Sequence, residues 1–147
     1  MDQPAAWGVT VDCADPRALA AFWALALGYR EPPVPAGSAT WDAWFEAQGV
    51  PEDERDGAAY LTDPSGRLPS LSLLRVPEPK TTKNRLHLDL KVSGGRDAPQ
   101  ERREDAIRSK VAELCGAGAR VLEEHDGPRG LDHVVLADPE GNELCVV

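Results

Sequence analysis

The chain has 147 residues, of which 41% are hydrophobic and 28% charged, so it fits one domain with a core and a soluble surface. Its 16 basic and 25 acidic residues give a net charge of −9, which counts against a nucleic acid or an anionic membrane as partner, because both require a basic face and the sequence shows none. No apolar stretch suits a transmembrane helix, the start MDQPAAWG lacks a signal-peptide pattern, and Cys13, Cys115 and Cys145 lack metal-finger spacing, so we expect a cytoplasmic protein with reduced thiols.

The chain opens with a predicted strand and a capped helix. Residues 7–13, WGVTVDC, alternate apolar and polar side chains, as a half-buried strand does. Asp15 then supplies an N-cap and Pro16 a residue suited to the first helical turn. An apolar stripe with helical spacing follows at Leu19, Phe22, Trp23 and Ala26. Gly28 is expected to end the helix.

An aromatic segment follows a proline-rich loop. The alternation in TWDAWFE, residues 40–46, predicts a short strand with Trp41 and Phe45 on one face and Trp44 on the other. The acidic segment 51–57 is expected to be a solvated loop. Two more strands, at 58–62 and roughly 70–76, are joined by the turn DPSG. The first half is therefore predicted to be β-α-β-β-β.

The same order returns after a linker at residues 77–84. Residues 86–92, LHLDLKV, alternate like a strand, and Asp97 with Pro99 opens a second helix that ends near Gly116. Its apolar stripe is Ile107, Val111, Leu114 and Cys115. Three more strands are predicted, at 120–123, 131–137 and 143–147.

Two matched features support an internal repeat. GYR at 28–30 corresponds to GAR at 118–120, and DPSG at 63–66 corresponds to DPEG at 138–141. We therefore predict an α+β fold in which two tandem βαβββ modules, about 5–77 and 85–147, form one domain over residues 1–147. One such module leaves a sheet face bare, and pairing two of them would create a concave cleft.

Three stretches resemble the vicinal oxygen chelate (VOC) superfamily of glyoxalases, bleomycin-resistance proteins and extradiol dioxygenases. They are VDCADPRALAAFWALALGY, VPEPKTTKNRLHLDLKV and VVLADPEGNELCVV, and the last two resemble a glyoxalase-like subgroup. The resemblance covers nearly the whole chain. It implies paired βαβββ modules and, in many members, a divalent metal held by the first and last strands of each module.

When the metal-ligand positions of the family are assigned to this sequence residue by residue, most of the ligands are missing. The first-strand ligands fall on His87 and on Gly8, which has no side chain. The last-strand ligands fall on Cys145, where Glu would be usual, and on residues 71–74, which include no carboxylate. We therefore expect no cofactor. If a divalent ion (Zn, Ni, Mn or Fe) were bound, His87 and Glu143 would be its candidate ligands.

The spacing of the polar residues suggests where a ligand would be bound. His87 and Asp89 alternate on one strand and Glu143 and Cys145 on another, so each pair is expected to share a face. His87 could contact a ligand or act as an acid or base, or it could simply fix the sheet. Cys145 could bind a soft metal or be a packed thiol.

Other candidates depend on strand orientation. His133 would converge with His87 and Glu143 if it faced the same side, whereas His125 is expected in a solvated turn. Trp44 and Tyr60 are candidates to line a pocket for a ring-bearing ligand, the alternative being that they cover a helix.

Three functions remain open. The first is a metal-independent protein that binds a small organic molecule, with aromatic character, in the cleft. The second is a metal-dependent lyase or isomerase of glyoxalase type, and the third is a non-catalytic interaction module. We favour the first, and homodimerisation is expected from the resemblance alone.

Overall fold

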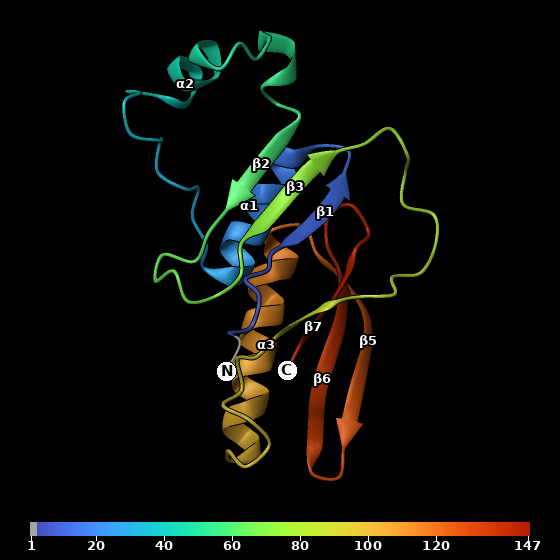
Figure 1. Ribbon diagram of the computed structural model, residues 1–147. Helices are drawn as coiled ribbons and strands as arrows, with labels where there is room; N and C mark the ends of the chain where they lie inside the picture. The colour runs from blue at the N-terminus through green and yellow to red at the C-terminus, as the bar shows by residue number, and fades with distance from the viewer. Residues whose placement is uncertain (1–2) are drawn as a thin grey trace. The chain divides into compact units, whose positions relative to one another are not determined.

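The computed structural model describes residues 3–147 and confirms the α+β fold class, with two sheets and three α-helices (Figure 1). The elements in chain order are β1 (Val9–Cys13), α1 (Pro16–Leu27), α2 (Trp41–Ala47), a short 3-10 helix (Glu52–Glu54), β2 (Ala58–Leu61), β3 (Leu71–Arg75), β4 (Leu88–Leu90), α3 (Gln100–Gly116), β5 (Arg120–Gly127), β6 (Gly130–Ala137) and β7 (Glu143–Val146). In the described part of the chain, no helix is long and apolar enough to cross a bilayer.

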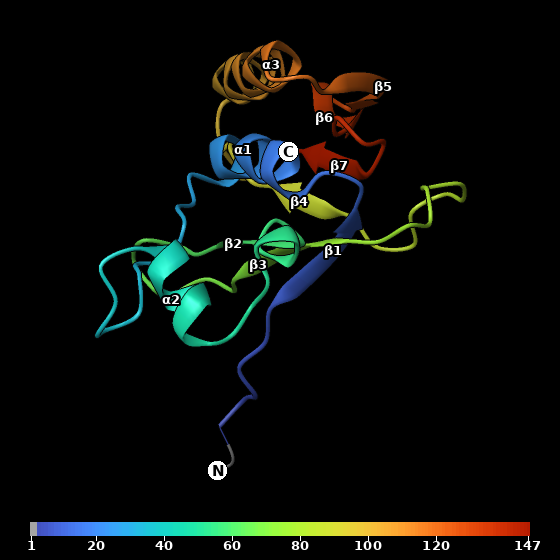
Figure 2. The ribbon, with the colours of Figure 1, turned by 90° about the horizontal axis from the view of Figure 1, so that it is seen from above.

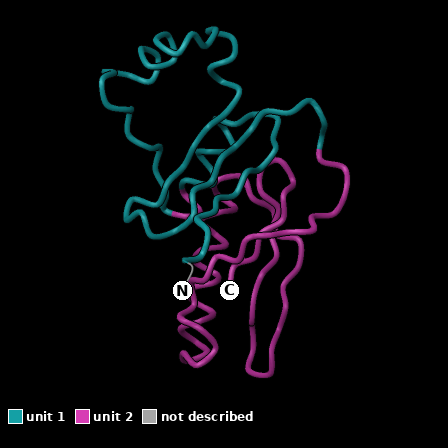
Figure 3. Tube along the Cα trace, in the orientation of Figure 1, with its two compact units in different colours: residues 1–24, 28–79 teal, residues 25–27, 80–147 magenta. Residues whose placement is uncertain are grey.

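The chain divides into two compact units, drawn in different colours in Figure 3. The first comprises the residues up to 24 together with 28–79, and the second comprises 25–27 with 80–147. The first contains the sheet β1-β3-β2, and the second contains the sheet β4-β7-β6-β5. These two units are the first and the second module.

The sheet of the first module has one buried face and one open face. β1 and β3 run parallel, and β2 pairs with β3 antiparallel. Leu61, Leu71 and Leu73 are buried, whereas the alternating residues Tyr60 and Leu74 are 49% and 44% exposed. Because side chains alternate between faces, Tyr60 and Leu74 belong to the open face of this sheet.

The caps of α1 are those that the sequence predicts. The Asp15 carboxylate accepts a hydrogen bond from the Ala18 amide at 3.1 Å, and Pro16 occupies the first turn. Gly28 ends the helix with φ of 70°, a left-handed conformation that glycine adopts without steric cost. The stripe Leu19, Phe22, Trp23 and Ala26 is buried.

The predicted strand at 40–46 is wrong, because this segment is the helix α2. Thr40 is its N-cap and accepts a hydrogen bond from the Ala43 amide at 3.1 Å. Asp42 lies in the first turn, where a carboxylate favours helix formation. A seven-residue segment can fit both the strand period and the helix period, and the N-cap at Thr40 is the local feature that favours the helix. The first module therefore has three strands plus one isolated bridge, between Arg30 and Thr62.

The second module has the full βαβββ order. β4 and β7 are parallel, whereas β5, β6 and β7 pair antiparallel. The helix α3 packs against β5, β6 and β7, and its side chains Ile107 and Leu114 are fully buried with Leu136 and Leu144 of the sheet. One face of this sheet is thereby covered by α3 (Figure 1).

Two predicted boundaries in the second module need correction. The strand predicted at 86–92 is limited to Leu88–Leu90, and Leu86 is 87% exposed. The strand predicted at 120–123 continues to Gly127, so His125 lies in β5 and not in a turn. Pairing with the long strand β6 extends β5 in spite of its polar sequence.

Candidate functional site

A polar cluster lies where β4 and β7 run side by side in the second module. Asp89 is paired in register with Cys145, and His87 precedes β4 by one residue. The His87 Nε2 atom lies 3.3 Å from Asp89 Oδ1. One donor atom of each of these three residues lies within 4.8 Å of the other two. The shared face expected for His87 and Asp89 is therefore present.

The Cys145 thiol of this cluster is shielded from solvent. It is 6% exposed, and burial raises its pKa, to which the negative charge of the neighbouring Asp89 adds. The thiol also shares a hydrogen bond with the Asp89 carboxylate. A raised pKa keeps the thiol protonated at neutral pH, so Cys145 is a poor nucleophile here.

Glu143 is paired with a residue of the linker. Its carboxylate lies 2.5 Å from Lys83 Nζ, and the pKa of Glu143 is lowered, first by this hydrogen bond. The charges of Lys83 and Lys80 lower it further. The Glu143 carboxylate is therefore paired with Lys83, and Glu143 is not part of the group formed by His87, Asp89 and Cys145.

His133 is held by partners of its own. Its ring stacks on His125 with centroids 4.4 Å apart, and its Nδ1 lies 3.0 Å from Asp132 Oδ2. Asp132 is in turn bound by Arg96 and by the buried Arg103. These contacts lower the pKa of Asp132, Arg96 contributing most. The described residues that gather as metal donors therefore do not include His133, and a ligand-binding role for it stays a prediction.

The metal set implied by the resemblance does not fit the first module. An added Cβ at Gly8 would lie 2.8 Å from Ser70 Oγ and 3.2 Å from the Ser70 carbonyl oxygen, so a ligand side chain would displace its neighbour. Residues 71–74, on β3, offer no carboxylate. His87, Asp89 and Cys145 form instead a three-donor group within the second module, and its imidazole and thiol suit zinc better than magnesium or calcium.

The first module contains a second candidate site, built around α2. Trp41, Trp44 and Phe45 share one face of this helix, with ring centroids 5.4–5.9 Å apart. The expectation that Trp44 would point away from the other two is therefore wrong. No residue of α2 is buried, although three of its seven side chains are aromatic. The cluster has contacts within itself but is not part of the core.

Three pockets adjoin this cluster, and all three are lined by Phe45 and Tyr60. The largest, about 870 Å³, is lined by Trp44 and Val50 and, among others, by Leu74 and Val76. A second, about 340 Å³, is lined by all three aromatic residues of α2 and by Ser72. Both pockets are lined by residues of α2 and by residues of β2 and β3, the strands that lie near α2 in the view of Figure 2. The open face of the sheet and the aromatic helix therefore border the same apolar space.

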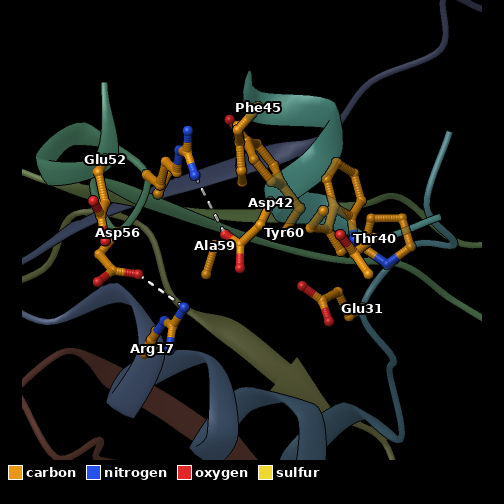
Figure 4. Close-up of a pocket in the computed structure, with 13 residues that line it drawn as sticks. Arg17, Glu31, Thr40, Asp42, Phe45, Glu52, Asp56, Ala59 and Tyr60 are labelled. Atoms are coloured by element: carbon orange, nitrogen blue, oxygen red, sulfur yellow. Dashed lines mark ion pairs between the residues drawn. The ribbon is translucent and has the colours of Figure 1, made fainter. Parts of the chain in front are cut away.

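The third pocket, about 540 Å³, has a charged lining (Figure 4). It is lined by Trp41 and Phe45 and by six ionisable side chains, Arg17, Glu31, Asp42, Glu52, Arg55 and Asp56. Sequence reasoning considered Trp41 and selected Trp44 and Tyr60, but it missed Phe45 and these charges as site residues. The helical i, i+3, i+4 spacing of Trp41, Trp44 and Phe45 after Thr40 was the signal that could have found Phe45.

A sequence model of a glyoxalase-like domain matches residues 8–147. The chain belongs to the glyoxalase-like domain family. The resemblance to the VOC superfamily is therefore confirmed. A search of curated proteins finds no relative.

Solved structures share the fold of this glyoxalase-like protein at low sequence identity. A glyoxalase/bleomycin resistance protein/dioxygenase family enzyme from Burkholderia phytofirmans is 15% identical, with a TM-score of 0.61 over 94% of this chain and 93% of that one. A mutant of the fosfomycin resistance protein FosX from Listeria monocytogenes, complexed with Mn(II) and a dihydroxypropylphosphonic acid, is 8% identical, with a TM-score of 0.60 over 99% and 90%. Lactoylglutathione lyase from Agrobacterium tumefaciens is 12% identical, with a TM-score of 0.55 over 99% and 93%.

Proposed function

We propose that this glyoxalase-like protein binds a small, ring-bearing organic molecule in the pockets beneath α2 and breaks no bond in it. The observation that carries the proposal is the helix α2 itself, on which Trp41, Trp44 and Phe45 adjoin pockets of the same module without any residue being buried. Aromatic side chains left outside the core expose apolar area that water solvates unfavourably. A flat ligand placed against them would remove that area from water.

The composition of the pocket supports binding more than catalysis. Trp44, Phe45 and Tyr60 offer ring faces and edges, and Ser72 and Thr62 add a few hydroxyl groups. This combination of apolar walls and few polar groups is typical of small-molecule sites. The described residues that line the three pockets include neither histidine nor cysteine, the usual bases and nucleophiles.

Ligand binding would also stabilise α2. A seven-residue helix is marginal in water unless tertiary contacts hold it. A ring that contacts both α2 and the open face of β2–β3 would supply such contacts. The proposal therefore includes a coupling between occupancy and the order of this helix.

The test is a titration with 1-naphthalenemethanol, a neutral ring-bearing probe, monitored by isothermal calorimetry. We expect saturable binding to the wild-type protein and a loss of about tenfold in affinity for Trp44→Ala, because the ring loses one wall. Trp7→Ala is the matched control, since Trp7 is 68% exposed and lines none of the three pockets. No saturable binding, or equal losses in both variants, would contradict the proposal.

A second candidate, a metal-dependent lyase or isomerase, is favoured by one observation, the group His87, Asp89 and Cys145. The FosX and lactoylglutathione lyase structures make such chemistry a candidate for the fold, since one holds Mn(II) and the other is a lyase. A bound divalent ion would polarise substrate oxygens. The test is the metal content of untagged protein beside His87→Ala. About one equivalent of metal, lost in the variant, would support this candidate, and no uptake by either protein would exclude it.

A further inference from the structure

We propose that the ligand bound beneath α2 is a ring-bearing organic cation, such as an aryl-alkyl ammonium compound. This inference rests on the proposed function and names its ligand class. It starts from the charged pocket of about 540 Å³, which shares Phe45 and Tyr60 with both apolar pockets and Trp41 with the smaller one. A molecule whose ring contacts these side chains would bring its polar end to the charged lining.

The basic residues of this lining are already engaged. Arg17 pairs with Asp56 at 2.9 Å, and Arg55 lies 3.8 Å from Asp42. Arg55 also donates through Nε to the Val50 carbonyl oxygen at 3.2 Å. Figure 4 shows Arg17 turned towards Asp56, and its dashed lines mark both ion pairs. An anionic ligand would have to break these pairs, whereas a cation would not.

Two carboxylates of the lining remain without such a partner. Glu31 and Glu52 are exposed, and neither forms an ion pair with any basic residue that the structure describes. Four carboxylates and two guanidinium groups give the pocket lining a net charge of −2. An exposed carboxylate contributes only modestly to the binding of a cation, but Glu31 and Glu52 would both attract the same bound charge.

The net charge of residues 1–79, which contain the pocket, also favours a cationic ligand. Residues 1–79 contain 12 acidic and 5 basic residues, a net charge of −7, whereas residues 80–147 contain 13 and 11, a net charge of −2. The acidic excess of the chain is therefore concentrated in the segment that holds the aromatic pocket. Such a field raises the local concentration of small cations and lowers that of anions.

The aromatic side chains of the pocket also favour a cationic ligand. Tryptophan is the side chain whose ring face attracts cations most strongly, and the partly exposed Trp41 lines the charged pocket. The Phe45 ring lies 5.9 Å from that of Trp41, so an ammonium group near Trp41 would be next to a second ring. Ring faces and carboxylates that border one pocket are the chemistry that recognises an aromatic amine.

The experiment compares three probes that share one ring and differ in charge. They are the cation 1-naphthylmethylamine, the neutral alcohol 1-naphthalenemethanol and the carboxylate 1-naphthaleneacetate, each titrated by calorimetry at pH 7. We expect the amine to bind about fivefold more tightly than the alcohol and the carboxylate more weakly than both. Raising the salt to about 0.5 M should reduce the preference for the amine, because the carboxylates are exposed.

Paired variants assign the preference to this pocket. Glu31→Gln combined with Glu52→Gln should remove most of the preference for the amine and leave the affinity for the alcohol unchanged. The control combines Glu101→Gln with Asp105→Asn on α3, which removes the same charge elsewhere and should retain most of the preference. Binding of the alcohol with no advantage for the amine would overturn the cation inference and leave the proposed function standing. Failure of all three probes to bind would overturn both.

Discussion

Arg30 and Thr62 pair through two backbone hydrogen bonds, of 3.0 Å from the Arg30 amide and 2.8 Å from the Thr62 amide. In the second module, Arg120 pairs with Ala137 at the corresponding place, just after a helix and just before a DPxG turn. There the pairing continues along all of β5, whereas in the first module it stops after one bridge. The freed chain forms α2, so the aromatic site occurs where the two modules differ.

The N-cap of α2 gives the first prediction. Thr40→Ala removes the side-chain acceptor for the Ala43 amide and should cost α2 about 1 kcal/mol. Hydrogen exchange of amides in α2 should accelerate, and the affinity for 1-naphthalenemethanol should fall. Thr40→Ser keeps the hydroxyl and is the control. Equal exchange rates in Thr40→Ala and wild type would contradict the role of this cap.

The two faces of β3 give the second prediction. Leu73 is fully buried, so Leu73→Ala should lower the free energy of unfolding by about 3 kcal/mol. The neighbouring Leu74 is on the open face, and Leu74→Ala should change stability by less than about 1 kcal/mol. Because Leu74 lines the largest pocket, its loss should weaken ligand binding instead. Urea denaturation and calorimetry separate these effects, and equal stability losses would refute the assignment of faces.

The turn at Asp63 gives a prediction on pH dependence. Hydrogen bonds from the Ser65 hydroxyl and amide, and from the amides of Leu68 and Arg67, lower the pKa of Asp63 to about 2. Because the pKa in the folded state lies below the unfolded value near 4, the ionised carboxylate stabilises the fold above about pH 4. This contribution is lost as the pH falls through about 2. Carboxyl carbon NMR should show Asp63 titrating near pH 2, and a midpoint near 4 would show that these hydrogen bonds are weak in solution.

The thiol of Cys145 gives a prediction on reactivity. Burial and the Asp89 charge raise its pKa, so a dithionitrobenzoate reagent should label it far more slowly than the exposed Cys115. In a protein whose other two cysteines are replaced by alanine, Asp89→Asn should accelerate labelling several-fold, because it removes one cause of the raised pKa. Asp97→Asn is the charge-matched control, and equal rates in the two variants would disprove the influence of Asp89.

Sequence reasoning recovered the features that depend on local chemistry. Asp15 caps the start of α1 through its carboxylate, and Gly28 ends the helix because glycine adopts a positive φ without steric cost. The DPxG turns at Gly66 and Gly141 likewise have the positive φ that the motif predicts. Alternation also placed His87 and Asp89 on one face. Such features need only a few neighbouring residues, and a single sequence therefore reveals them.

The features it missed depend on partners distant in the chain. His125 lies in a strand because β6 pairs with it and places His133 opposite, which no residue near His125 indicates. The space around Phe45 arises because the open face of β2–β3 lies beside α2. The charged lining joins Arg17 of α1 to Glu52, 35 positions later. These proximities are products of tertiary structure and could not be read from spacing.

The most direct measurement is the set of four indole N–H resonances in a nitrogen-15 NMR spectrum, assigned by single substitutions. On addition of 1-naphthylmethylamine, the signals of Trp41 and Trp44 should move with one common dissociation constant, because both rings line the pockets beneath α2. The signals of the buried Trp23 and the exposed Trp7 should stay in place. Movement of Trp7 or Trp23 instead, or of none of the four, would contradict the proposed site.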